Sequence, residues 1–237
     1  MKTSKSFDQA IEAFIQTVSD QVVLDLAHES TQEKSRIQNE IARLISDSSI
    51  DYVEQLRRGY LTLIQSVEKY GGDASSYKLE IKSQENEEIT GQNLPVGKYV
   101  QEEIGYTNDQ MVELYEVASR LFDERHYPEA LDAFFFLGSL MPRVSSYWIA
   151  VGSCYEKMHK TEEAFQIYRL AILLDPLEIK NWIHGFRVAI AGHHIHEIEE
   201  LTQTAQKILD KLHHTHEPPE FVKELEQLLN EVERAPR

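Results

Sequence analysis

The side chains of this 237-residue chain that could do chemistry are ten histidines and one cysteine. Two histidine clusters stand out, HHIH at 193–196 and HHTH at 213–216, because neighbouring imidazoles can bind zinc or nickel. Neither cluster contains a cysteine or completes a set of four ligands, and both lie where polar helix junctions are expected. We therefore predict no metal and no other cofactor.

The single cysteine, Cys154, has no second cysteine with which to form an internal disulfide. A cysteine within an apolar helical pattern is more often a small buried side chain than a nucleophile, so we predict a structural thiol. The sequence also lacks a glycine-rich phosphate loop, a paired-carboxylate motif and a nucleophile elbow. These observations favour a binding protein over an enzyme.

The charge of the chain limits its partners. There are 40 acidic residues against 24 lysines and arginines, and the formal net charge of −16 would repel nucleic acid and anionic membranes. No stretch of about 18 apolar residues could span a bilayer. The N-terminal residues also lack the apolar run of a signal peptide. We expect a cytoplasmic protein that binds no nucleic acid and does not insert stably into a membrane.

Helical periodicity organises the first part of the chain. Apolar residues recur every three or four positions over 7–26, 37–45 and 53–67, as the buried face of a helix requires. We therefore predict three helices and an N-terminal helical region at 1–70.

A polar linker is predicted to follow at 71–96, because this stretch begins with two glycines and contains few apolar residues. Three of those apolar residues alternate as in a short strand: Tyr77, Leu79 and Ile81. Helical periodicity then resumes, and Thr107 with Gln110 forms a capping-box pattern before the apolar run. We predict a second domain at 97–237.

An internal repeat of 34 residues defines this second domain. The pairs separated by this interval are Trp148 and Trp182, Pro142 and Pro176, and Ala130 and Ala164. The interval is that of the tetratricopeptide repeat, a helix–turn–helix unit. The repeats cover about 111–144, 145–178 and 179–212, and an amphipathic helix over about 219–233 would cap them. The sequence predicts an all-α tetratricopeptide-repeat solenoid with a C-terminal capping helix, preceded by an N-terminal helical region.

Small and large residues alternate in the middle repeat as close helix packing requires. Gly152 and Ala164 occupy small positions of the tetratricopeptide pattern, among large residues such as Tyr168. We predict that Gly152 leaves room for Ala164 on the antiparallel partner helix. The third repeat departs from the pattern, with Phe186 and Ile198 where small residues are expected.

The concave surface of such repeats is lined by fixed positions of each first helix, and it offers a candidate peptide-binding site. The residues at these positions are Val112, Tyr115, Ser119, Phe122, Ile149, Ser153, Glu156, Ile183, Arg187 and Ile190. Arg187 alone cannot clamp the carboxylates of an acidic C-terminus, so an extended apolar segment fits this groove better. The alternative is that Tyr115 and Phe122 pack against the N-terminal helices.

Three stretches carry a resemblance to a known family: LYEVASRLFDERHYPEALDAFFFL, YWIAVGSCYEKMHKTEEAFQIYRLAILLDP and PPEFVKELEQLL. They resemble the class II chaperones of bacterial type III secretion, the SycD/LcrH-type chaperones of translocator proteins. The match covers roughly residues 97–232 and follows the same order of elements, a short helix, three repeats and a capping helix.

The resemblance implies that the groove holds an extended N-terminal segment of a hydrophobic translocator or effector, which stays soluble and secretion-competent in the cytoplasm of a Gram-negative bacterium. By position, Tyr115 and Phe122 match aromatic groove residues of the family, whereas Ser119 replaces a position that is often aromatic. The N-terminal arm of the family contributes to dimerisation, so residues 1–70 could mediate a homodimer. Two alternatives remain, a general tetratricopeptide scaffold in a regulatory or secretion-apparatus complex and an enzyme assembled from the histidine clusters.

Overall fold

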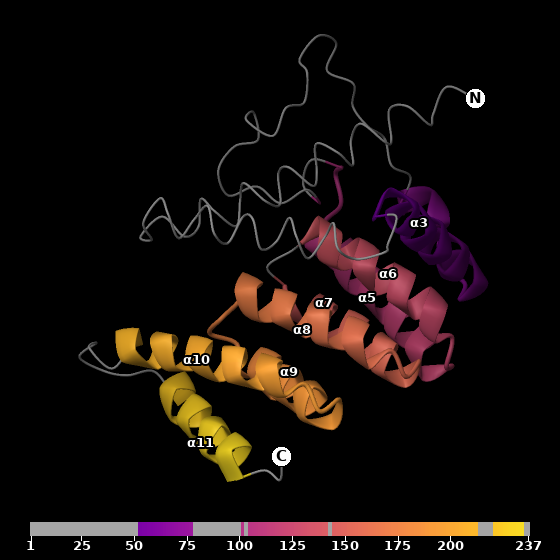
Figure 1. Ribbon diagram of the computed structural model, residues 1–237. Coiled ribbons are helices and arrows are strands. Elements are labelled where there is room, and N and C mark those ends of the chain that lie inside the picture. The colour runs from indigo at the N-terminus through magenta and orange to yellow at the C-terminus, as the bar shows by residue number, and fades with distance from the viewer. Residues whose placement is uncertain (1–51, 78–100, 102–103, 142–143, 213–219, 235–237) are drawn as a thin grey trace. The chain divides into compact units, whose positions relative to one another are not determined.

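The computed structural model describes residues 52–77, 101, 104–141, 144–212 and 220–234, and the helices predicted over 7–26 and 37–45 lie outside these ranges. The regular structure within the described residues is entirely helical, which confirms the all-α class. The elements are α3 (Tyr52–Lys69), a short 3₁₀ helix η1 (Ala74–Tyr77), α5 (Asn108–Asp123), α6 (Tyr127–Leu140), α7 (Ser145–Lys157), α8 (Thr161–Leu174), α9 (Ile179–Ala191), α10 (Ile195–Leu212) and α11 (Glu220–Arg234) (Figure 1).

The turns between paired helices confirm the repeat independently of side-chain packing. The second helices of the three pairs, α6, α8 and α10, begin at Tyr127, Thr161 and Ile195, so each start lies one repeat length after the previous one. Two positions before each start, a residue other than glycine has a positive φ. These residues are Arg125 (67°), His159 (59°) and His193 (55°). The same backbone conformation therefore closes all three helix pairs.

The start of the first repeat is fixed by the predicted capping box. The side chain of Thr107 accepts a hydrogen bond from the main-chain N–H of Gln110, at 3.2 Å, and the Thr107 N–H donates to Oε1 of Gln110 at 2.9 Å. Two of the N–H groups that a helix start leaves without partners are thus satisfied. The prediction of a capping box at this position is confirmed.

The chain divides into two compact units, with the boundary between Tyr147 and Trp148, inside α7. In the first unit α3 packs against α5 and α6 (Figure 1). This grouping differs from the predicted separation of an N-terminal region from the repeats, because the helix predicted at 53–67 lies directly on the first repeat.

Helix α6 is buried over most of its surface, and both α3 and α5 pack against it. Ten of its residues are buried, including three consecutive phenylalanines. Phe134 contacts the ring of Tyr115 on α5, with centroids 5.5 Å apart, and Phe136 contacts the ring of Tyr60 on α3, at 5.8 Å. A helix that is apolar all round needs partners on more than one face, and α3 is one of these partners.

Helix α3 approaches α6 closely at Gly59. A Cβ atom added to this glycine would lie 2.2 Å from the main-chain oxygen of Asp132 and 2.7 Å from Cβ of Phe136. Beside this contact the guanidinium of Arg58 donates to both carboxylate oxygens of Asp132, at 2.9 and 3.3 Å. A forked ion pair and a glycine contact therefore set the register of α3 on α6.

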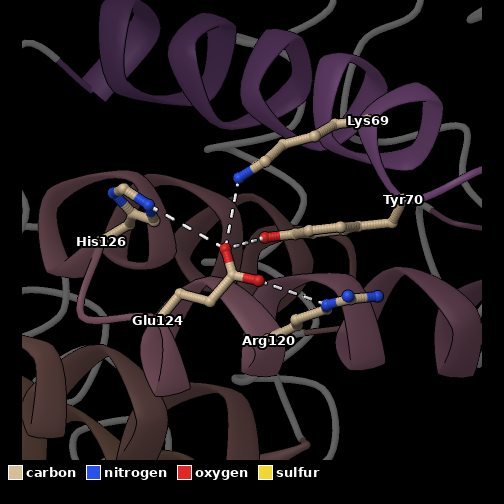
Figure 2. A network of polar contacts seen from close by, with 5 residues as sticks. All are labelled: Lys69, Tyr70, Arg120, Glu124 and His126. Carbon is tan, nitrogen blue, oxygen red and sulfur yellow. Dashed lines mark hydrogen bonds and ion pairs between the residues drawn. The ribbon is translucent and has the colours of Figure 1, made fainter.

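The end of α3 is held by polar contacts around Glu124, the residue after α5. Figure 2 shows the side chains of Lys69, Tyr70, Arg120 and His126 converging on the Glu124 carboxylate. Tyr70 donates to this carboxylate at 2.8 Å, Lys69 at 3.2 Å and Arg120 at 3.3 Å. The hydrogen bond from Tyr70 is the largest cause that lowers the pKa of Glu124, and the Lys69 hydrogen bond adds to it.

The start of the predicted linker is packed rather than free. Tyr77, expected in a short strand, is instead the last residue of η1 and is buried. Its carbonyl accepts a hydrogen bond from the hydroxyl of Tyr106 at 2.5 Å, and its own hydroxyl donates to Glu113 on α5. The strand prediction is therefore wrong at Tyr77, while Leu79 and Ile81 lie outside the described residues.

In the second unit the small residue Gly152 on α7 lies closest to the ring of Tyr168 on α8. A Cβ atom at Gly152 would lie 2.5 Å from Cε1 of the Tyr168 ring on α8, and Ala164 is not among its nearest neighbours. That Gly152 also makes room for Ala164 stays a prediction, because the three atoms nearest to the added Cβ all belong to the Tyr168 ring. The missing side chain accommodates the tyrosine ring, which is fully buried.

Helix α11 confirms the predicted C-terminal cap. It packs against both α9 and α10, and it buries Phe221, Val222, Leu225, Leu229 and Val232. Its opposite face carries glutamate, lysine and asparagine side chains that are exposed. Among the described residues, no helix is long and apolar enough to cross a membrane.

Candidate functional site

The first unit carries the predicted site residues of α5. Val112 is 56% exposed, whereas Tyr115, Ser119 and Phe122 are half-buried. The ring of Tyr115 lies between Phe134 and Tyr147, with centroid distances of 5.5 and 5.6 Å. These rings come from α6 and the start of α7, so both ring contacts of Tyr115 lie within its own unit.

Phe122 also packs within its own repeat. Its ring meets that of Tyr127, at the start of α6, with centroids 5.3 Å apart in an edge-on arrangement. The ring contacts recorded for Tyr115 and Phe122 among the described residues do not involve α3. The alternative that these rings pack against the N-terminal helices stays open, and the helices predicted at 7–26 and 37–45 lie outside the described residues.

The second unit carries the remaining predicted residues, on α7 and α9. Ile183 is 43% exposed, and Ile149 and Ile190 are half-buried. The three predicted polar residues of this unit, Ser153, Glu156 and Arg187, belong to one polar cluster.

Oε1 of Glu156 accepts two hydrogen bonds in this polar cluster. The hydroxyl of Tyr168 donates to it at 2.5 Å, and Nη2 of Arg187 donates to it at 2.6 Å. Nη2 of Arg187 also lies 2.9 Å from Nδ1 of His184, and the hydroxyls of Ser153 and Tyr168 are 3.4 Å apart. The cluster therefore joins α7, α8 and α9 through five side chains.

Burial decides the protonation states in the cluster. It is the largest cause that raises the pKa of the Tyr168 hydroxyl, and the hydrogen bond to Glu156 raises this pKa further. Burial also lowers the pKa of His184, and the positive charge of Arg187 lowers it again. Tyr168 thus stays a donor, and a neutral His184 can accept from Arg187 through Nδ1 while carrying its proton on Nε2.

Sequence reasoning missed two members of this cluster. The repeat pattern predicts only a packing role for Tyr168 and no role for His184, yet the two rings stack with centroids 5.1 Å apart and an interplanar angle of 24°. His184 precedes Arg187 by three positions, and residues at this spacing share a helix face. This spacing is the signal in the sequence that places His184 beside Arg187. The sequence around Tyr168 contains no such signal that its side chain reaches α9.

His194 and Cys154, two of the residues that could do metal or thiol chemistry, have structural roles. His194 stacks on Phe165 with centroids 5.7 Å apart, and its Nε2 lies 3.7 Å from a carboxylate oxygen of Glu162. Within the described ranges, no three side chains of the metal-binding types converge, and the cluster at 213–216 lies outside them. Cys154 is buried, which raises its pKa to about 12 and supports the prediction of a structural thiol.

No family model matches the chain, and no match was found among curated proteins. Among solved structures, the type III secretion translocator chaperone SycD of Yersinia enterocolitica aligns with a TM-score of 0.43 and 18% identity, over 57% of this chain and 98% of its own. A chain of the CopN-Scc3 complex aligns with a TM-score of 0.45 and 13% identity, over 72% of this chain and 98% of its own.

A third solved structure is PcrH in complex with the chaperone binding region of PopD. It aligns with a TM-score of 0.41 and 18% identity, over 54% of this chain and 95% of its own.

Proposed function

We propose that this protein is a chaperone of type III secretion. It binds an extended apolar segment of a translocator or effector protein through the first helices of its repeats, and keeps that protein soluble and secretion-competent in the cytoplasm. The proposal rests on one structural observation, that the first helices leave apolar side chains in solvent at the predicted site positions. Val112 on α5 is 56% exposed and Ile183 on α9 is 43% exposed. The motifs of the sequence indicate the class of partner.

The electrostatics of the predicted site favour an apolar partner over an acidic one. Arg187 is the only cation among the predicted site residues, and its guanidinium already donates to Glu156 at 2.6 Å. A peptide carboxylate at this position would meet the charge of Glu156 as well as that of Arg187. Apolar side chains meet no such opposition, and their burial against exposed isoleucine and valine is favourable.

The test is capture of partners by the full chain, in its native host, after a charge has been placed on the predicted surface. We expect Val112→Asp and Ile183→Asp each to abolish capture, because an apolar segment cannot be buried against an unpaired carboxylate. Both positions are exposed, so neither substitution should unfold the protein. The matched control is Leu61→Asp on α3, where a side chain that is 47% exposed lies outside the predicted site.

Mass spectrometry of the captured proteins then decides between the chaperone and the general scaffold. A hydrophobic translocator or effector that is lost with Ile183→Asp and kept with Leu61→Asp supports the chaperone. A captured set made only of regulatory or apparatus proteins would favour the general scaffold. If Val112→Asp, Ile183→Asp and Leu61→Asp all reduced capture equally, a binding site on the first helices would be contradicted.

A further inference from the structure

We propose that Glu156 and Arg187 bind the main chain of the captured segment, Glu156 by accepting from a peptide N–H and Arg187 by donating to a peptide C=O. This inference rests on the proposed function, because it identifies which groups of an extended apolar segment the site recognises. It goes beyond that function because it assigns recognition to a polar pair that apolar contacts alone would not require.

Both members of the pair have unused hydrogen-bonding capacity. The contacts recorded for Glu156 with the described residues all use Oε1, and the contacts of Arg187 all use Nη2. Oε2 of the carboxylate and Nε and Nη1 of the guanidinium therefore remain available, beside each other on α7 and α9. The two side chains are 29% and 52% exposed, so a ligand can reach them.

The chemistry of the pair matches a peptide group. An ion pair at 2.6 Å carries no net charge, so neither an anion nor a cation is favoured by both of its members. A neutral group that offers one donor and one acceptor satisfies both. The side chains of an apolar segment offer no polar atoms, but its main chain offers an N–H and a C=O at almost every residue, and these groups need partners once water is removed.

Neighbouring side chains hold the pair in place before any ligand arrives. The Tyr168 hydroxyl, on a side chain that is fully buried, fixes Oε1 of Glu156, and Nδ1 of His184 lies within hydrogen-bond distance of Arg187. A ligand therefore meets an oriented donor and acceptor, and little side-chain entropy is lost on binding. This arrangement distinguishes the pair from an ordinary surface ion pair between two free side chains.

Apolar residues flank the pair along α9. Ile183 lies four positions before Arg187 and Ile190 three positions after it, so the three share one face of the helix. In an extended segment, successive side chains point to opposite sides while the main-chain groups point across the strand direction. The isoleucines can therefore contact side chains of the segment while Glu156 and Arg187 contact its main chain.

The experiment begins with random dodecapeptides displayed on phage and selected on the full-length protein. The best binder is synthesised with a fluorophore, together with a series in which one main-chain nitrogen at a time is methylated. Affinities are measured by fluorescence anisotropy for the wild type, Arg187→Met and Glu156→Leu. Lys207→Met on α10 is the control, because it removes an exposed cation from the second helix of the same repeat. Thermal melts followed by circular dichroism verify that each variant is folded.

We expect Arg187→Met to weaken binding about ten- to a hundredfold, the range for hydrogen bonds to a charged group, and Lys207→Met to leave it unchanged. One N-methylated peptide should bind the wild type about tenfold more weakly than its parent, yet bind Glu156→Leu as well as its parent does. This non-additive result would identify the N–H that Glu156 accepts, and it does not depend on Arg187→Met being folded.

Three outcomes would overturn the inference. An apolar peptide that binds all variants equally would show that the pair is not used, while leaving the proposed function intact. A methylation series with the same losses on wild type and Glu156→Leu would place the main-chain contacts elsewhere. The third outcome is that the selected peptides share an Asn or Gln, and that replacing this residue weakens binding as much as Arg187→Met does. The group bound by the pair would then be a side-chain amide. Selection of charged peptides only, or of none, would instead contradict the proposed function.

Discussion

Gly152 is a single residue on which the pairing of α7 with α8 depends. The ring of Tyr168 fills the space where a side chain at this position would be, and the hydroxyl of the same ring reaches Glu156. The sequence predicted correctly that the position must be small, because the tetratricopeptide pattern requires it. It could not identify the Tyr168 ring as the nearest group. The pattern gives the size of each residue, but it does not say which side chain of the neighbouring helix fills the space beside a small one.

A comparison of two glycines within helices tests this contact. Alanine normally stabilises a helix interior by about 1 kcal/mol relative to glycine. In Gly152→Ala, however, the new methyl overlaps a ring that is fully buried and hydrogen-bonded to Glu156, and such overpacking costs about 1–3 kcal/mol. We expect Gly152→Ala to lower the free energy of unfolding. At Gly185 on α9 the nearest atom to an added Cβ is the flexible end of Ile172, at 3.1 Å, so Gly185→Ala should be neutral or stabilising.

Urea denaturation of both variants measures the difference. The contact described here would be contradicted if Gly152→Ala were as stable as Gly185→Ala, because the two positions would then be equally free of steric conflict.

The polar cluster around Glu156 also shows where residue-level prediction stops. Ser153, Glu156 and Arg187 were predicted to share a face, and the structure brings them together. Their partners could not be predicted in the same way. Tyr168 comes from the second helix, and its reach past Gly152 depends on how closely α7 and α8 approach each other. Spacing along one helix does not contain that information.

At the scale of elements, the three paired helices could be predicted and the position of α3 could not. The repeat period fixes which helices pair, because each helix pair repeats the same pattern of small and large residues. No such pattern connects α3 to α6. The signal that was available is the run Phe134, Phe135 and Phe136, since three consecutive buried rings cannot all face one partner helix.

Gly59→Ala tests the position of α3. The obstacle to a methyl group is the main-chain oxygen of Asp132, at 2.2 Å, and a main-chain atom cannot rotate away as a side chain can. We expect α3 to separate from α6 at this point and its amide hydrogens to exchange faster, while those of α9 and α10 keep their protection.

The matched control for this substitution is Leu61→Ala, on the exposed side of the same helix. It should leave the exchange of α3 unchanged. Unchanged exchange in Gly59→Ala as well would mean that α3 does not approach α6 at Gly59.

At the scale of the whole molecule, the division of the chain at residue 96 stays a prediction. The structure divides the described residues within α7 instead, and groups α3 and η1 with the first repeat. Composition suggested a linker because residues 71–96 are polar, but polarity does not exclude packing. Tyr77 is buried, and both its hydroxyl and its carbonyl make hydrogen bonds. The partners of these bonds, Glu113 and Tyr106, lie beyond the predicted linker.

A fragment of residues 97–237 tests the division. It contains the three repeats and α11, so we expect it to fold with a cooperative helical transition. Because it lacks α3, the ring of Phe136 loses its contact with Tyr60, and the carboxylate of Asp132 loses its forked partner, Arg58. We therefore expect the fragment to unfold at a lower urea concentration than the full chain and to bind a dye for exposed apolar surface. A synthetic peptide of residues 52–77, added in excess, should reverse both effects, because it restores α3 and η1.

A fragment without a cooperative transition would show that α3 belongs to the repeat domain and that the division at residue 96 is wrong. A fragment as stable as the full chain would show that the contacts of α3 contribute no net stability.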